Sequence, residues 1–217
     1  MDRRTRTDDN NLMLLLALRL RRDDNCLDVG ANRGIFLEQF RRIAPHGRHI
    51  AYEPVPLLAT RLARDYPDME IRQRALSDVD GQSSFMHVVD PDLEAYSGLA
   101  EAWAERDVVT ESITVITERL DDHLPSGWLP QFVKIDVEGA ERLVLEGAMR
   151  TLRLARPTIA FEHGWHGDED RDRSEPIYQL ICEDLGLRLF DMDGNGPLAL
   201  SEFFDGLRTR WNWVAHE

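Results

Sequence analysis

The sequence predicts an α/β fold in which a mostly parallel sheet of seven strands carries helices on both faces. Short apolar runs alternate with amphipathic segments along most of the chain, and such alternation requires parallel strands joined by crossover helices. Residues 132–137 form a nearly continuous apolar run, which is typical of a strand buried on both faces. The chain has 217 residues, an ordinary length for one domain with a substantial core. We therefore expect residues 1–217 to form a single domain.

Local patterns locate the individual elements. We expect a first helix, capped near Asp9 or Asn10, to pack on the domain within residues 1–24. The turn signal Asp80-Gly81 predicts an inserted hairpin or extra strand over residues 83–89, and the region around residues 95–99 is less regular. The sheet strands are predicted at residues 25–29, 49–53, 70–76, 132–137, 158–161, 187–190 and 211–214. Helical spacing of apolar residues predicts helices at residues 35–43, 56–65, 140–154 and 176–185.

The end of the first predicted strand carries the pattern of a nucleoside site. Asp28, Gly30 and Gly34 close this strand just before an amphipathic helix, and Glu53 ends the next apolar run. Glycine has no Cβ, so the backbone here can approach a bound nucleoside closely. A carboxylate about 20 residues downstream is placed to accept ribose hydroxyls. The alternative is a tight strand-to-helix turn that binds no ligand.

The charges of this segment favour S-adenosylmethionine over a dinucleotide. A dinucleotide site needs Gly-x-Gly-x-x-Gly, whereas this loop has only Gly30 and Gly34, and Asp28 would repel a phosphate. S-adenosylmethionine has no phosphate but carries an ammonium, a carboxylate and a sulfonium. We expect Asp28 to contact the ammonium, the backbone N–H groups near Asn32 to contact the carboxylate, and Glu53 to bind the ribose.

Composition limits the partners and the compartment. The net charge of −14 argues against a protein that grips nucleic acid, because phosphate neutralisation needs a basic surface. Cys26 and Cys182 are too few for a disulfide framework, which favours the cytoplasm. The apolar run 12–18 is short for a signal peptide and is followed by arginines rather than a cleavage site. We expect a small-molecule substrate, no nucleic-acid partner and no membrane partner; the oligomeric state stays open, a homodimer included.

Four motifs in register resemble the FkbM-type methyltransferase family. They are residues 28–34, Tyr52-Glu53-Pro54, residues 75–78, and residues 134–141 continuing into 145–148 and Pro157. The resemblance spans roughly residues 25–163. It implies a Rossmann-like class I methyltransferase fold with an antiparallel last strand. It also implies methyl transfer from S-adenosylmethionine to a hydroxyl of a small molecule, such as an antibiotic precursor or a sugar. The cofactor-binding residues that follow are Asp28, Gly30, Ala31, Asn32, Gly34, Glu53, Pro54, Ala75, Leu76 and Asp136.

Three residues beyond the fourth and fifth strands are candidates for a general base: His163, Asp136 and Glu138. His163 has the ordinary pKa nearest to neutral pH, although a buried structural histidine is an equally good interpretation. Asp136 lies nearest its strand end, with capping of the next helix as the alternative. Lys134, the single lysine among 26 basic residues, shares a strand face with Asp136. It is placed either to hold Asp136 ionised or to form an ordinary ion pair.

Two sequence patterns could indicate a metal site, but we predict that neither segment binds a metal ion. Residues 191–202 satisfy the EF-hand calcium-loop pattern, but Gly186 ends the preceding helix and residues 187–190 alternate like a strand. We therefore interpret residues 193–196 as a hairpin turn. Acidic and histidine residues over 162–170 could bind a divalent ion together with Asp136, although a solvated acidic loop is the simpler interpretation. Two alternative functions remain, an NAD-dependent oxidoreductase or epimerase and a calcium-responsive binding module.

Overall fold

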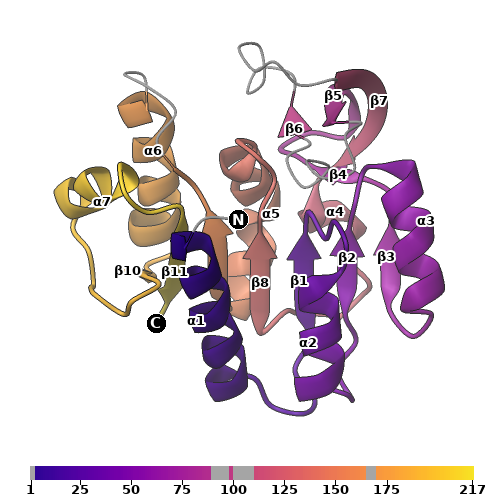
Figure 1. Cartoon of the computed structure of the whole chain (residues 1–217), viewed down its shortest axis with the longest axis horizontal. Helices are drawn as coiled ribbons and strands as arrows, with labels where there is room; N and C mark the ends of the chain where they lie inside the picture. The colour runs from indigo at the N-terminus through magenta and orange to yellow at the C-terminus, as the bar shows by residue number, and fades with distance from the viewer. Residues whose placement is uncertain (1–2, 89–97, 100–109, 165–169) are drawn as a thin grey trace.

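The computed structural model describes residues 3–88, 98–99, 110–164 and 170–217, and its larger sheet has seven strands (Figure 1). The strand order is β10-β11-β9-β8-β1-β2-β3. Only β11 runs antiparallel to its neighbours in this sheet, which confirms the predicted mostly parallel sheet with an antiparallel last strand. The bounds are β1 (Cys26–Val29), β2 (Ile50–Tyr52), β3 (Glu70–Arg72), β8 (Phe132–Ile135), β9 (Thr158–Glu162), β10 (Arg188–Asp191) and β11 (Asn212–His216).

Helices cover both faces of this sheet, with α1 and α2 on the near face in Figure 1 and α4 and α5 on the far face. The helix α1 begins at Arg3, so the predicted cap near Asp9 or Asn10 is wrong; no glycine or proline precedes these residues to stop the helix. The bounds are α1 (Arg3–Arg19), α2 (Ile35–Ile43), α3 (Pro56–Asp65), α4 (Leu120–His123), α5 (Glu141–Ala155), α6 (Asp170–Tyr178), the π-helical segment Gln179–Asp184, and α7 (Leu200–Leu207).

The central strand β8 explains why the core has two halves. Its four residues are all buried, and alternate side chains enter different apolar clusters. Val133 and Ile135 pack with the α5 side, whereas Phe132 packs with Leu16 of α1 and Phe40 of α2. A strand covered on both faces is apolar along nearly its whole length, and Lys134 is the exception in β8.

A second sheet stands above the carboxyl ends of β1 and β2 (Figure 1). Its order is β4-β7-β5-β6, with β4 (Ala75–Leu76), β5 (Gly81–Val88), β6 (Gly98–Leu99) and β7 (Thr110–Glu118). The predicted third strand over 70–76 is therefore divided between the two sheets. The extra strand at 83–89 is confirmed as β5, but its partner β7 was not predicted. Residues 95–97 lie outside the described residues.

Late in the chain, the predicted helix over 176–185 begins six residues earlier, at Asp170, and becomes π-helical from Gln179. Proline is favoured in the first turn, which suggested a start at Pro176, but here Pro176 lies inside α6 at the loss of one backbone hydrogen bond. Among the described residues, no helix combines the length and apolar character needed to cross a lipid bilayer.

Candidate cofactor and acceptor site

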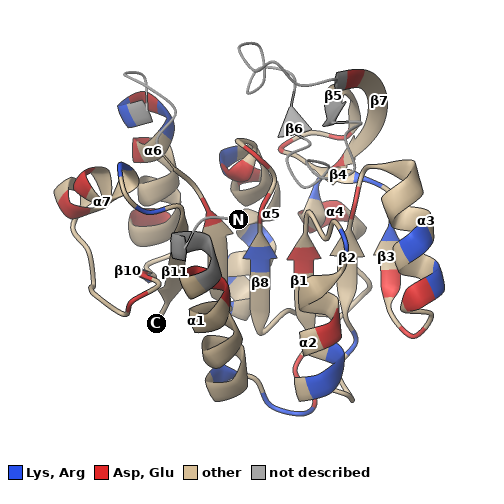
Figure 2. Cartoon of the chain, in the orientation of Figure 1, with Lys and Arg blue, Asp and Glu red and all other residues tan. Residues whose placement is uncertain are grey.

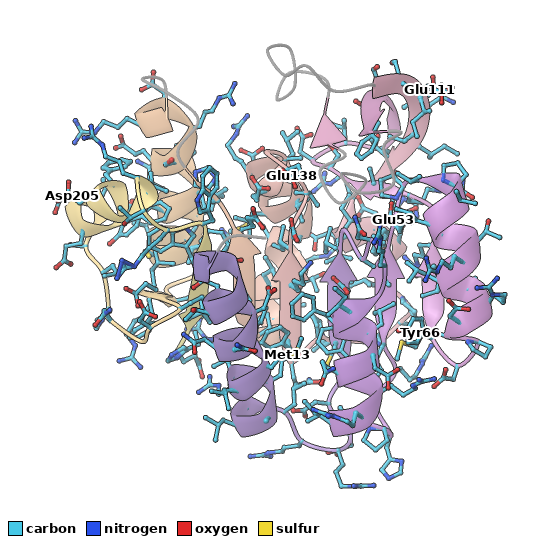
Figure 3. All side chains as sticks on the ribbon, in the orientation of Figure 1. Met13, Glu53, Tyr66, Glu111, Glu138 and Asp205 are labelled. Carbon is cyan, nitrogen blue, oxygen red and sulfur yellow. The ribbon has the colours of Figure 1, made fainter. Side chains whose placement is uncertain are left out.

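A cleft opens at the carboxyl edge of the larger sheet, where the loops after β1, β2 and β8 meet the second sheet. In Figure 3 the side chains of Glu53 and Glu138 lie at this edge, whereas those of Met13 and Tyr66 lie well below it. The predicted cofactor residues that line the cleft are Gly30, Asn32, Glu53, Pro54, Ala75, Leu76 and Asp136. Segments far apart in the sequence thus converge, as expected for parallel strands that end at one edge.

Gly30 is required where two of these loops touch. Its φ of 81° is left-handed, and a Cβ added there would lie 1.9 Å from the carbonyl oxygen of Asp136. The backbone N–H of Asp136 also donates a hydrogen bond to the carbonyl of Val29, at 3.0 Å. The close approach that we expected with a bound nucleoside is therefore made, at least in part, with the chain's own β8–α5 loop.

Glu53 is held firmly at the wall of the cleft. Its carboxylate accepts the backbone N–H of Asn32 at 2.7 Å and that of Val55 at 2.9 Å, and the residue is 3% exposed. Burial raises the pKa of Glu53 to about 7, although the two N–H donors act in the opposite direction. Each carboxylate oxygen has a second lone pair with which it can accept a hydroxyl of a ligand.

Three other predicted cofactor residues lie outside the cleft. Asp28 is fully buried beside the Lys134 ammonium, 3.6 Å away, because these residues face each other in the register of β1 and β8. Ala31 packs in the apolar cluster between α1 and α2. Gly34 precedes α2 and lies against Leu62 and Tyr66. These positions do not support the predicted contact of Asp28 with an ammonium, nor direct cofactor contacts of Ala31 and Gly34.

Acidic side chains gather just beyond β8 and β9. Carboxylate oxygens of Asp136, Glu138 and Glu162 lie within 4.8 Å of one another. Burial, together with the charges of Asp136 and Glu138, raises the pKa of Glu162 to about 9. The Lys134 ammonium lies 3.1 Å from Asp136 Oδ2 and supplies positive charge to this group. Glu138 has a left-handed φ of 53°, which is unusual for a residue with a side chain and common at functional sites.

His163 is not among the residues that line the cleft, and its role as general base stays a prediction. The residue is 7% exposed, and its Nε2 lies 2.7 Å from the hydroxyl of the buried Ser174. Its Nδ1 lies 3.7 Å from a carboxylate oxygen of Glu141, and its ring stacks near Phe203. With both ring nitrogens engaged inside the fold, these surroundings fit the alternative of a buried structural histidine. The other two candidates, Asp136 and Glu138, line the cleft.

The segment with the EF-hand pattern forms a turn in which polar groups of the turn itself hydrogen-bond to one another. Asp191 ends β10 and accepts hydrogen bonds from the backbone N–H groups of Asp193 and Asn195, both at 2.9 Å. Arg210 Nη2 lies 2.6 Å from Asp191 Oδ2, so a cation already faces this carboxylate. The turn prediction fits this geometry, whereas a calcium site does not. In the other segment considered for a metal ion, residues 165–169 lie outside the described residues.

The second sheet supplies cleft residues that the sequence did not reveal. Ser83 and Phe85 from β5 and Thr117 from β7 line the cleft opposite Glu53 and its neighbours. Tyr52 also lines it, and its hydroxyl donates a hydrogen bond to Glu118 of β7 at 2.9 Å. Recognition of β7 would have required weighing the polar–apolar alternation of residues 110–118 as a strand signal.

Comparisons with known proteins agree with this fold. A family model described as the methyltransferase FkbM domain matches residues 28–189. A solved FkbM methyltransferase from Methylobacillus flagellatus superposes with a TM-score of 0.57 at 17% identity, over 92% of this chain and 45% of that one. Fibrillarin from Aeropyrum pernix, solved with natively bound S-adenosyl-L-methionine, has a TM-score of 0.50 at 15% identity, over 96% of this chain and 74% of its own.

One curated relative matches a shorter segment. The AMB antimetabolite synthetase AmbE of Pseudomonas aeruginosa is 37% identical over 90 residues, which is 38% of this chain and 4% of AmbE. The chain therefore spans only a small fraction of AmbE and less than half of the Methylobacillus protein.

Together, the strand order, the cleft at the carboxyl edge and these comparisons define a Rossmann-like class I methyltransferase fold. The chain belongs to the FkbM methyltransferase family, as the four sequence motifs indicated.

Proposed function

We propose that this protein transfers a methyl group from S-adenosylmethionine to a hydroxyl of a small molecule. The observation that carries the proposal is the Glu53 carboxylate, which two backbone N–H groups fix at the wall of a cleft of the FkbM methyltransferase fold. The match with an antimetabolite synthetase favours an acceptor from natural-product biosynthesis. Acidic side chains, rather than basic ones, dominate the strand ends that face this edge, which disfavours an RNA or DNA acceptor.

The cleft has the chemistry that the methyl donor requires. Glu53 can accept the ribose hydroxyls. The backbone N–H of Asn32 is already donated to Glu53, so Asn32 can contact the amino acid end only through its side-chain amide. Leu76, Phe85 and their apolar neighbours line the wall near the second sheet and are suited to an adenine ring. No phosphate-binding glycine triplet is present in the loop after β1, which distinguishes this site from a dinucleotide site.

The bound donor would supply an activated methyl carbon, so the protein has two tasks, to orient the acceptor oxygen and to remove its proton. Orientation of two reactants can lower a barrier by about 7–11 kcal/mol. Asp136 and Glu138 line the cleft and are the candidates to accept the hydroxyl proton while the new C–O bond forms and the S–C bond breaks. A general base contributes about 10²–10⁴-fold.

Ligand binding tests the donor, and labelled transfer tests the acceptor. We expect isothermal titration calorimetry to detect S-adenosylmethionine and S-adenosylhomocysteine, with no heat from NAD⁺ at the same concentration. Labelled methyl groups should then pass to hydroxylated natural-product precursors but not to their amine analogues. Binding of NAD⁺ alone would contradict the methyltransferase proposal, and transfer to nitrogen would contradict the O-methylation.

A further inference from the structure

Lys134 occupies a buried position that the reaction scheme has not used. The residue is 7% exposed on β8, and its Nζ lies 3.1 Å from Asp136 Oδ2 and 3.6 Å from Asp28 Oδ1. Figure 2 shows this positive charge on β8 directly beside the negative charge on β1. The ammonium also lies 4.9 Å from the centre of the Phe36 ring, on α2. Three contacts on different elements therefore fix where the charge lies.

Negative charges face this ammonium from several of the elements around it. Lys134 lines a second, smaller cavity under α1, and Asp136 lines both that cavity and the cleft. Like charges so close together would favour protonation of one carboxylate unless a cation offsets them. The acidic residues that face this region are Asp8 and Asp9 from α1, Asp28 from β1, Glu53 after β2, Asp136 and Glu138 after β8, and Glu162 from β9.

We propose that Lys134 is a positioning residue of the methyl-transfer site, whose ammonium holds the Asp136 carboxylate oriented between the cleft and the second cavity. This inference rests on the proposed function. Lys134 does not line the cleft, so it acts through Asp136 and not on the reacting atoms. Asp28 also contributes here, because its fully buried carboxylate faces the same ammonium, 3.6 Å away, and within the described part of the chain no other side chain or backbone group donates a hydrogen bond to it. A merely structural ion pair would stabilise the fold without orienting the carboxylate at the cleft.

A single lysine in the whole sequence gives this proposal a direct probe. Protein labelled with [13Cε]lysine should show one lysine methylene cross-peak, which reports the protonation of Lys134. Although burial acts to lower it, the Asp136 and Asp28 carboxylates raise the pKa of Lys134 above its usual range. We expect the ammonium to persist well above the pH at which free lysine titrates. In D136N it should deprotonate at lower pH, and S-adenosylhomocysteine should move the cross-peak of the wild type only.

Calorimetry then separates positioning from a structural role. K134M should bind S-adenosylmethionine at least about tenfold more weakly, because the Asp136 carboxylate loses the ammonium that holds it in place, and a lost hydrogen bond of a charged group typically costs at least about that factor. K134R, which keeps a cation at this position, should retain most of the wild-type affinity. R153M, which removes an exposed cation at the end of α5, should change nothing. A general electrostatic effect would change the affinity of K134M in the opposite direction, since loss of a cation would strengthen the binding of a cationic ligand.

Each outcome is decisive. A lysine cross-peak that titrates like free lysine and ignores D136N would overturn the proposal, and so would K134M binding as tightly as the wild type at neutral pH. If K134M does not fold, the variant D28N/K134M removes one carboxylate together with the ammonium and allows the same comparison. Absence of binding of both ligands to the wild type, with a normal Lys134–Asp136 coupling in the spectrum, would instead refute the proposed function.

Discussion

The burial of Glu53 leads to a prediction about stability and ligand binding that one variant, Glu53→Gln, can test. Its pKa is about 7 in the folded protein against an ordinary 4.5, so the folded state holds this proton more tightly than the unfolded state does. A raised carboxylate pKa therefore costs stability as pH rises from about 4.5 to 7, and the full difference is about 3 kcal/mol. Glutamine has no charge to titrate. Between pH 5.5 and 8.5, the variant should gain about 2 kcal/mol relative to the wild type.

Urea unfolding at these two pH values measures that gain, because subtracting the two proteins removes the contribution of every other titrating group. Glu111→Gln, an exposed position on β7 (Figure 3), is the matched control and should show no such change. At alkaline pH the loss of a charged acceptor should also weaken S-adenosylhomocysteine binding by about 10- to 100-fold, since such hydrogen bonds contribute about 1.5–3 kcal/mol. A stability difference that stays constant with pH would refute the burial argument, and unchanged affinity would refute the ribose contact.

Three further predictions concern the supports of the site. Gly30→Ala should destabilise the protein by more than about 3 kcal/mol in thermal or urea unfolding, because its Cβ would overlap a backbone carbonyl. Gly127→Ala, with a similar φ of 75° but open surroundings, should cost only about 1 kcal/mol; equal losses would contradict the clash. Ser174→Ala should cost about 1–3 kcal/mol by leaving His163 without its partner, and turnover at saturation should stay within twofold. A large loss of turnover would favour His163 as a catalytic residue. Finally, millimolar calcium should leave the melting temperature unchanged, because Arg210 already faces the acidic turn after β10; a rise would favour the binding-module alternative.

The larger sheet could be predicted because its signals are local. The bounds of α2 and α3 agree with the predicted helices, since apolar periodicity and a proline at the first position mark them within a few residues. The split of the third strand was not predictable in this way. Residues 70–76 have the pattern of one strand that contains apolar residues. The chain changes direction at Gln73 and Arg74, however, so β4 pairs with β7, about 40 residues away, rather than with the larger sheet.

For the site, the sequence identified which loops meet but not which side chains face the cleft. Gly30, Glu53 and Asp136 lie where the strand-end rule places them. Asp28 belongs to the first motif and His163 ends the segment that resembles the family, yet neither lines the cleft. Strand register turns Asp28 toward Lys134, and the fold places Ser174 beside His163. A pattern of residue types cannot distinguish these cases, since the fold, and not the local sequence, decides which partner each side chain meets.

The second sheet has its own small apolar cluster, in which Phe85 and Val115 pack with Val55 and Leu58 of the α3 segment. That cluster is separate from the two that hold the larger sheet together. The wall of the cleft that the second sheet forms therefore has an apolar core of its own. Substitutions in β5 and β7 can therefore change the shape of this wall without disturbing the packing of the larger sheet, so changes in ligand selectivity among relatives should concentrate here.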